Sequence, residues 1–63
     1  MNGLDYKYRR HRLNLTQTEV ARLIGVSRYT LSGYETGRVE IPITVAFKLS
    51  KLYGLSELEI NRL

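Results

Sequence analysis

The residues between positions 16 and 25 constrain the fold of this chain more than any other part of its sequence. Thr16-Gln-Thr-Glu19 has the spacing of a capping box. In that motif the Thr16 hydroxyl accepts a hydrogen bond from the Glu19 amide, and the Glu19 side chain accepts one from the Thr16 amide. Gly25 follows soon afterwards, and glycine adopts positive φ without the steric cost of a Cβ. A capped start and a glycine stop so close together predict a short helix over about 17–24.

A second short helix follows at once. Ser27 is a favoured N-cap residue and Gly37 a stop, so the sequence predicts a helix over about 28–36. Two helices joined by a three- or four-residue turn cross steeply, and Ala21 places only a methyl group at that crossing. The apolar residues of the segment would form the shared core: Val20, Ile24, Val26, Leu31 and Tyr34. The spacing is that of a helix-turn-helix unit over 17–36; the alternative is a helical hairpin inside an unrelated bundle.

Three further helices are predicted outside this unit. Residues about 4–13 form an amphipathic segment that Asn14 can end, because asparagine tolerates the left-handed conformation. Pro42 suits a first helical turn, and Gly54 predicts a stop for a helix over about 42–53. A second capping box, Ser56-Glu-Leu-Glu59, begins a last helix over about 56–62.

Strand signals are missing from the sequence. It contains no sustained period-two alternation and no Asn-Gly or Asp-Gly hairpin turn. The expected fold is therefore all-α, with five helices in a single domain over residues 1–63. The chain has no cysteine, so neither a disulfide nor a thiolate zinc site can stabilise it, and its 43% apolar content has to supply the core.

The net charge of +4 is unevenly distributed. Residues 1–38 contain seven basic and three acidic side chains, whereas residues 39–63 contain three of each. A localised basic surface indicates a polyanionic partner, although a solvated surface of the same sign is the alternative. No apolar run is long enough to span a membrane and no signal-peptide pattern begins the chain, which favours a cytoplasmic protein.

The pattern as a whole resembles the phage-repressor and Cro-type (XRE-like) helix-turn-helix family, with its lambda-repressor-like DNA-binding domain. The resemblance rests on a set of motifs: Leu15-Thr-Gln17, Glu19-Val-Ala21, Ile24-Gly-Val-Ser27, Leu31, Tyr34-Glu35-x-Gly37, and Gly54-Leu-Ser56 after an apolar helix. It implies a sequence-specific regulator, bacterial or phage-encoded, that binds double-stranded DNA, associates with the nucleoid when bound, and acts as a homodimer. Nothing in the pattern suggests a cofactor or an enzyme.

The second helix of such a unit enters the major groove with its N-terminal residues at the base edges. Arg28 can pair with guanine in bidentate fashion, and Tyr29 can meet a thymine methyl group or donate its hydroxyl. Ser32 is short and would contact bases through water. Gly33 is the fourth candidate at this surface, although the family often has a long polar side chain there. It allows close backbone approach to DNA, weaker sequence reading or packing against another helix, and the sequence does not choose among these.

Phosphate contacts are expected around the same groove. Gln17 begins a helix, where free N–H groups and the helix dipole favour an anion, and the resemblance assigns it to a phosphate. The remaining candidates are Thr16, Ser27, Thr30 and Arg38. For Thr16 and Ser27, helix capping is the alternative role, and the two roles are compatible.

A structural ion pair is implied by the resemblance, in which an arginine of the first helix pairs with the glutamate of the Glu-x-Gly segment. Arg10 lies on the inward stripe of its helix, so Arg10–Glu35 is the expected pair, with Arg9 as the alternative. His11 has no second ligand nearby in the sequence, so no metal site is expected.

Two other functions remain open at this stage. One is an antitoxin or restriction-controller protein of the same fold, and the other is a protein–protein adaptor that has lost DNA binding. Ile43 and Phe47 point away from the main apolar stripes of their helix and need another helix or subunit to cover them. Ile60 and Leu63 are candidates for a dimer contact, and closing the monomer core is their alternative role.

Overall fold

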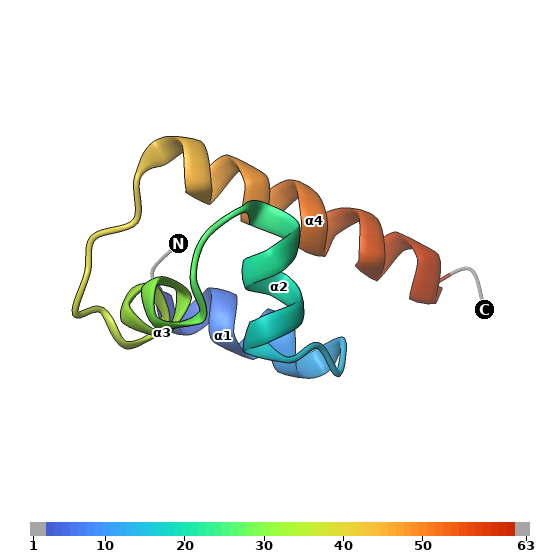
Figure 1. Cartoon of the computed structure of the whole chain (residues 1–63). Helices are drawn as coiled ribbons and strands as arrows, with labels where there is room; N and C mark the ends of the chain where they lie inside the picture. Colours follow the sequence, from blue (N-terminus) through green and yellow to red (C-terminus); the bar gives the residue numbers. More distant parts are fainter. Residues whose placement is uncertain (1–2, 62–63) are drawn as a thin grey trace.

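Four α-helices make up the computed structural model, which describes the backbone of residues 3–61 and the side chains of residues 3–54. They are α1 (Gly3–Arg12), α2 (Gln17–Ile24), α3 (Arg28–Thr36) and α4 (Ile43–Asn61), as Figure 1 shows. No strand occurs within the described backbone. The all-α fold class expected from the sequence is confirmed, with one fewer helix than expected.

The bounds of α2 and α3 agree with the sequence prediction because both helices are limited by local contacts. Thr16 and Glu19 form both hydrogen bonds of the capping box at the start of α2, each 3.1 Å long. Gly25 ends α2 in the left-handed conformation at φ 80°. The Ser27 hydroxyl then caps α3 by accepting from the Thr30 amide at 3.1 Å, and Gly37 ends α3 at φ 78°.

The predicted stop at Gly54 was wrong. Helix α4 continues through this residue to Asn61, so the separate fifth helix expected over 56–62 is absent from the described backbone, and Ser56 lies within α4. Gly54 is not among the described residues with positive φ. Glycine permits the left-handed conformation but does not require it, and staying helical costs only about 0.5–1 kcal/mol relative to alanine. Tyr53, the preceding residue, is fully buried and holds the helix against the core.

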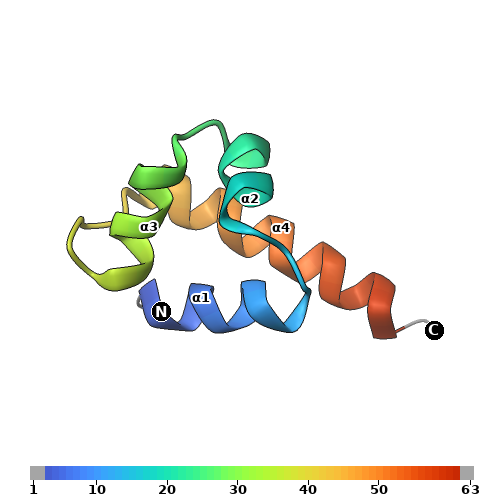
Figure 2. The ribbon, with the colours of Figure 1, turned by 60° about the horizontal axis from the view of Figure 1, so that its bottom comes forward.

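The core lies where α4 crosses the helix-turn-helix unit. Helix α1 packs against α3 and α4, and α2 packs against α3 and α4, an arrangement that can be followed in Figures 1 and 2. The fully buried side chains come from three helices: Val20, Leu31, Leu49 and Tyr53. Ala21 is 3% exposed at the crossing of α2 and α3, as its small size predicted. This packing turns the outer side of α3 toward solvent.

Candidate nucleic-acid interface

The N-terminal end of α3 presents two exposed side chains. Arg28 is exposed, Tyr29 is 75% exposed, and the Arg28 guanidinium carbon lies 5.3 Å from the centroid of the Tyr29 ring. A guanidinium at this distance from an aromatic ring makes a cation–π contact, which limits the freedom of both side chains. The two groups thus form an outward-facing pair that combines a fork of hydrogen-bond donors with an apolar ring.

Ser27 and Thr30 form a small hydroxyl cluster beside this pair. The Ser27 hydroxyl accepts from the Thr30 amide and donates to the Thr30 hydroxyl oxygen at 2.9 Å. The Thr30 hydroxyl proton is not used by these bonds and can be donated to an anion. Ser27 therefore caps α3, and Thr30 keeps a hydroxyl proton for a phosphate contact.

Further along α3 the outer face changes in character. Ser32 is half-buried, and its carbonyl oxygen accepts from the Thr36 hydroxyl at 3.0 Å. Gly33 is buried, because the Val39 side chain lies over it: a Cβ built at position 33 would stand 2.8 Å from Val39 Cγ2. Of the three roles open for Gly33, packing is the one that fits this geometry. Its covering partner is the loop after α3 rather than another helix, and this geometry does not favour a base contact at Gly33.

At the start of α2, Thr16 is exposed and Gln17 is half-buried. The Gln17 Nε2 donates to Glu35 Oε1 at 3.1 Å, which ties its amide to the end of α3. This bond uses one of the two N–H groups on Nε2, so the second remains able to donate to a phosphate. Through Glu35, the start of α2 is therefore linked to the C-terminal end of α3.

Arg10 and Glu35, both buried, form an ion pair that joins α1 to the end of α3. Arg10 donates from Nε to Glu35 Oε2 at 2.7 Å and from Nη2 to Oε1 at 2.9 Å, a bidentate arrangement. Its Nη1 donates to the Leu15 carbonyl at 2.8 Å, which also fixes the segment leading into α2. Arg9, the alternative partner for Glu35, instead lies with its guanidinium carbon 5.6 Å from the centroid of the Tyr53 ring.

The pair keeps Glu35 charged inside the fold. Burial alone raises the pKa of the Glu35 carboxyl, but hydrogen bonds from Arg10 and Gln17, together with the charges of Arg10 and His11, outweigh it and hold the pKa below 4.5. The sequence did not predict that Gln17 and the Leu15 carbonyl join this network. The sequence indicated only that both residues lie close to the start of α2.

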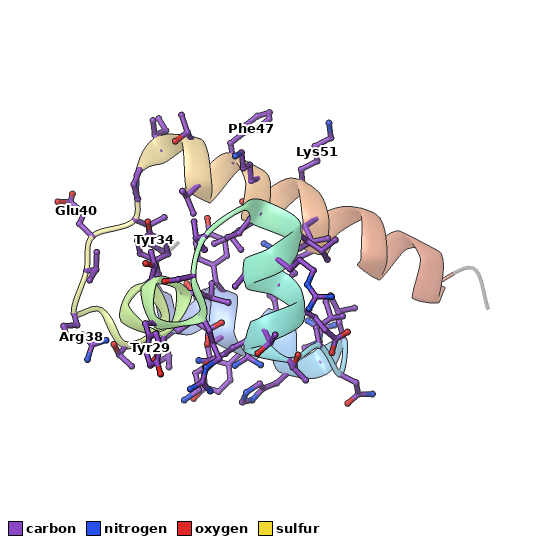
Figure 3. All side chains as sticks on the ribbon, viewed as in Figure 1. Tyr29, Tyr34, Arg38, Glu40, Phe47 and Lys51 are labelled. Atoms are coloured by element: carbon purple, nitrogen blue, oxygen red, sulfur yellow. The ribbon has the colours of Figure 1, made fainter. Side chains whose placement is uncertain are left out.

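Two faces of the molecule differ in chemistry. Figure 3 shows Tyr29 and Arg38 on one side of the fold and Phe47 and Lys51 on the opposite side. Arg38 is exposed in the loop after α3. On α4, Ile43 is 86% exposed and Phe47 71% exposed, so no described residue covers them. The candidates Ile60 and Leu63 lie outside the residues whose side chains the structure describes.

No group of three histidine, cysteine, aspartate or glutamate side chains is arranged for a metal ion within the described part of the chain. No described helix has the length and apolar content needed to cross a membrane. His11 Nε2 lies 3.1 Å from Arg10 Nη2, so it neighbours the buried ion pair.

The fold and the exposed end of α3 define a class: small all-helical domains that present the second helix of a helix-turn-helix unit to DNA. Comparison with known proteins agrees, since the family model described as helix-turn-helix matches residues 6–60. The chain belongs to this helix-turn-helix family of DNA-binding regulators, in its XRE-type branch. It is 41% identical over 49 residues to an uncharacterized HTH-type transcriptional regulator of Methanocaldococcus jannaschii. The aligned region covers 78% of this chain and 74% of that protein. No solved structure gives a significant match.

Proposed function

We propose that this chain is a sequence-specific, non-enzymatic transcription regulator of the repressor/Cro type, which places α3 in the major groove of double-stranded DNA. The observation that supports this most directly is the exposed Arg28–Tyr29 pair at the N-terminus of α3. Base edges in the major groove are contacted from this end of a recognition helix. In this proposal Arg28 pairs with a guanine, Tyr29 contacts a neighbouring base, and Ser32 contacts bases through water.

Phosphate contacts position the helix without selecting the sequence. We assign this role to Gln17 at the start of α2, with the Thr16 and Thr30 hydroxyls as further donors around the groove. The Ser27 hydroxyl proton is already donated to Thr30. The bond from Gln17 to Glu35 supports the assignment, because it joins the phosphate-facing amide to α3 and so couples the position of the two helices. Arg38, the remaining candidate, is exposed in the loop after α3.

The regulator is proposed to act in the cytoplasm as a homodimer, bound to the nucleoid. Two-fold symmetry would place the two copies of α3 about 34 Å apart, one turn of DNA. Mass measured in solution with and without a DNA duplex tests the assembly. Recovery of a strictly monomeric complex on a selected site would contradict it.

The division between base and phosphate contacts is tested with Arg28→Ala and Gln17→Ala. We expect Arg28→Ala to reduce the preference for a selected site over random DNA by about 1–3 kcal/mol. We expect Gln17→Ala to weaken binding to both DNAs about equally. Because Gln17 also bonds to Glu35, the unfolding midpoint of each variant should be measured in parallel. Equal effects of the two substitutions on site preference would refute the assignment.

A protein–protein adaptor is the second candidate, favoured by one observation: Ile43 and Phe47 are exposed side by side on α4, one helical turn apart. Salt dependence separates the two functions. A DNA-binding protein should lose affinity with a log–log slope of about −0.9 for each phosphate neutralised. If duplex binding is undetectable at low salt while a protein partner binds, the adaptor function is correct.

A further inference from the structure

The outer face of α3 has a gap at Gly33. Tyr29 and Gly33 lie one helical turn apart on the same stripe, and Tyr29 is highly exposed whereas Gly33 is buried. The loop after α3 causes this difference, since Val39 folds back over the glycine. A side chain at position 33 could not be added without moving Val39, because its Cβ would lie closer to Val39 Cγ2 than ordinary packing allows.

The returning loop is fixed by backbone contacts as well. Gly37 takes φ 78°, which reverses the chain direction. The Val39 amide then donates to the Gly33 carbonyl at 3.1 Å, and the Gly37 amide donates to the Tyr34 carbonyl at 3.3 Å. Arg38 lies between these two anchored residues, so its backbone position is determined by them.

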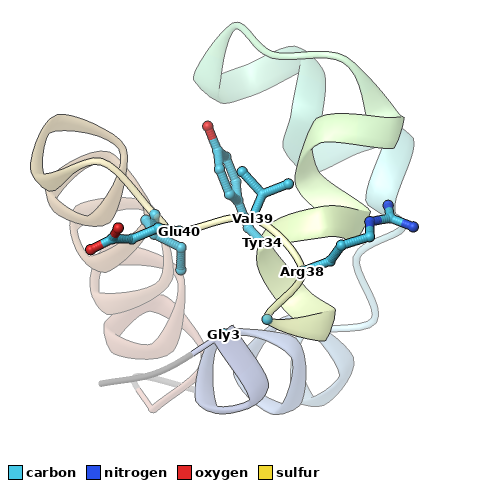
Figure 4. A pocket seen from close by; sticks show the side chains of 7 residues that line it. Gly3, Tyr34, Arg38, Val39 and Glu40 are labelled. Carbon is cyan, nitrogen blue, oxygen red and sulfur yellow. The ribbon is translucent and has the colours of Figure 1, made fainter.

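The Arg38 side chain extends along the outer side of α3. Its Nη2 lies 3.6 Å from the place that a Cβ at position 33 would occupy. Figure 4 shows Arg38 and Glu40 pointing in opposite directions from the loop. Around that loop, a hollow of about 570 Å³ is lined by residues 37–41 with Gly3 and Tyr34. Among the described residues, no ion pair or hydrogen bond engages the Arg38 guanidinium.

We propose that Arg38 contacts a base edge in the major groove from the C-terminal half of α3, and that Gly33 is the residue that lets the loop place it there. This inference rests on the proposed function. A guanidinium offers a planar fork of donors that fits the O6 and N7 acceptors of guanine. The Arg38 guanidinium lies on the stripe of α3 that includes Tyr29. This position favours contact with a base over contact with a phosphate, because phosphate contacts are made from the edges of the groove. The domain thus has two guanine-contacting arginines, Arg28 at one end of α3 and Arg38 at the other.

The test is a random-oligonucleotide selection with the whole chain, followed by titration of duplexes changed at one base pair. At a single base pair, Arg38→Ala should lose roughly 5- to 150-fold of the preference that the parent chain shows. Its binding to random DNA should be almost that of the parent. Arg38→Lys keeps the charge without the fork and should lose the same preference. Gly33→Ala should weaken it as well, because the added methyl group displaces the Val39 side chain and stands beside the Arg38 guanidinium.

Lys51→Ala is the matched control, because it removes one positive charge on the opposite face of the fold (Figure 3). It should leave the base profile unchanged. The inference is overturned if Arg38→Ala weakens all duplexes alike, with the salt slope reduced by about 0.9, as loss of one phosphate contact would do. If the parent chain selects no site at all, the proposed function fails first and this inference fails with it.

Discussion

The two ends of α3 are built in different ways. At the N-terminal end, Arg28 and Tyr29 are exposed, and the nearest support is the local cap from Ser27. At the C-terminal end, Gly33, Tyr34 and Glu35 are all buried. Contacts from α1, α2 and the following loop meet there: the Arg10 guanidinium, the Gln17 amide and the Val39 side chain.

Apart from Arg38 in the loop after α3, this difference separates the side chains that would select DNA from those that hold the helix. Substitution of an exposed side chain at the free end removes few packing contacts, so the recognition surface can change with little loss of stability. Substitution at the anchored end removes a buried partner and leaves another group unsatisfied. The free end can therefore vary in specificity while the anchored end preserves the pose of α3.

The largest effect should come from Glu35→Ala, which leaves the Arg10 guanidinium buried without its partner. Breaking a buried ion pair from one side costs about 3–5 kcal/mol, and in a chain of this size that is most of the stability. Urea unfolding followed by circular dichroism measures the loss. Glu40→Ala is the control, since it removes the same charge from an exposed loop position, and it should cost less than about 0.5 kcal/mol. Similar losses in both variants would mean that the ion pair does not anchor α3.

The second effect is a dependence of stability on pH. Glu35 has its pKa lowered in the folded chain, so the unfolded chain binds a proton at this carboxyl more readily. The stabilisation is therefore present above about pH 4.5, the ordinary pKa of the group. It is lost as the pH falls through the folded-state value.

Unfolding free energies between pH 3 and 7 check this dependence. The parent chain should lose stability toward acid by up to about 1.4 kcal/mol per pH unit more than Glu35→Gln, which has no proton to bind at this position. Parallel curves for the two proteins would show that Glu35 titrates normally in the fold.

Substitutions at the N-terminal end of α3 should change the unfolding free energy less. Ser27→Ala removes the oxygen that accepts from the Thr30 amide and should cost about 1 kcal/mol, as the loss of an N-cap does. Arg28→Ala should change the unfolding free energy by less than about 0.5 kcal/mol. Thermal and urea unfolding measure both variants. A loss for Ser27→Ala as large as that for Glu35→Ala would remove the contrast between the two ends.

Sequence reasoning performed best where the two partners of a contact are close in the chain. The caps at Thr16 and Ser27 and the glycine stops at Gly25 and Gly37 all fall where the sequence predicted them. Arg10–Glu35 joins residues far apart, and it was expected only because the chain resembles a family with such a pair. The roles of Arg28, Tyr29 and Gln17 toward DNA remain predictions.

The sequence by itself determined where α2 and α3 begin and end, because a helix cap joins residues three positions apart and both partners are visible in the chain. Tertiary structure alone decided that α4 passes through Gly54 and that Gln17 joins Glu35. A glycine permits several conformations, and the one adopted depends on what packs beside it. Those neighbours come from other parts of the chain, so their positions follow from how the helices pack and not from the local sequence.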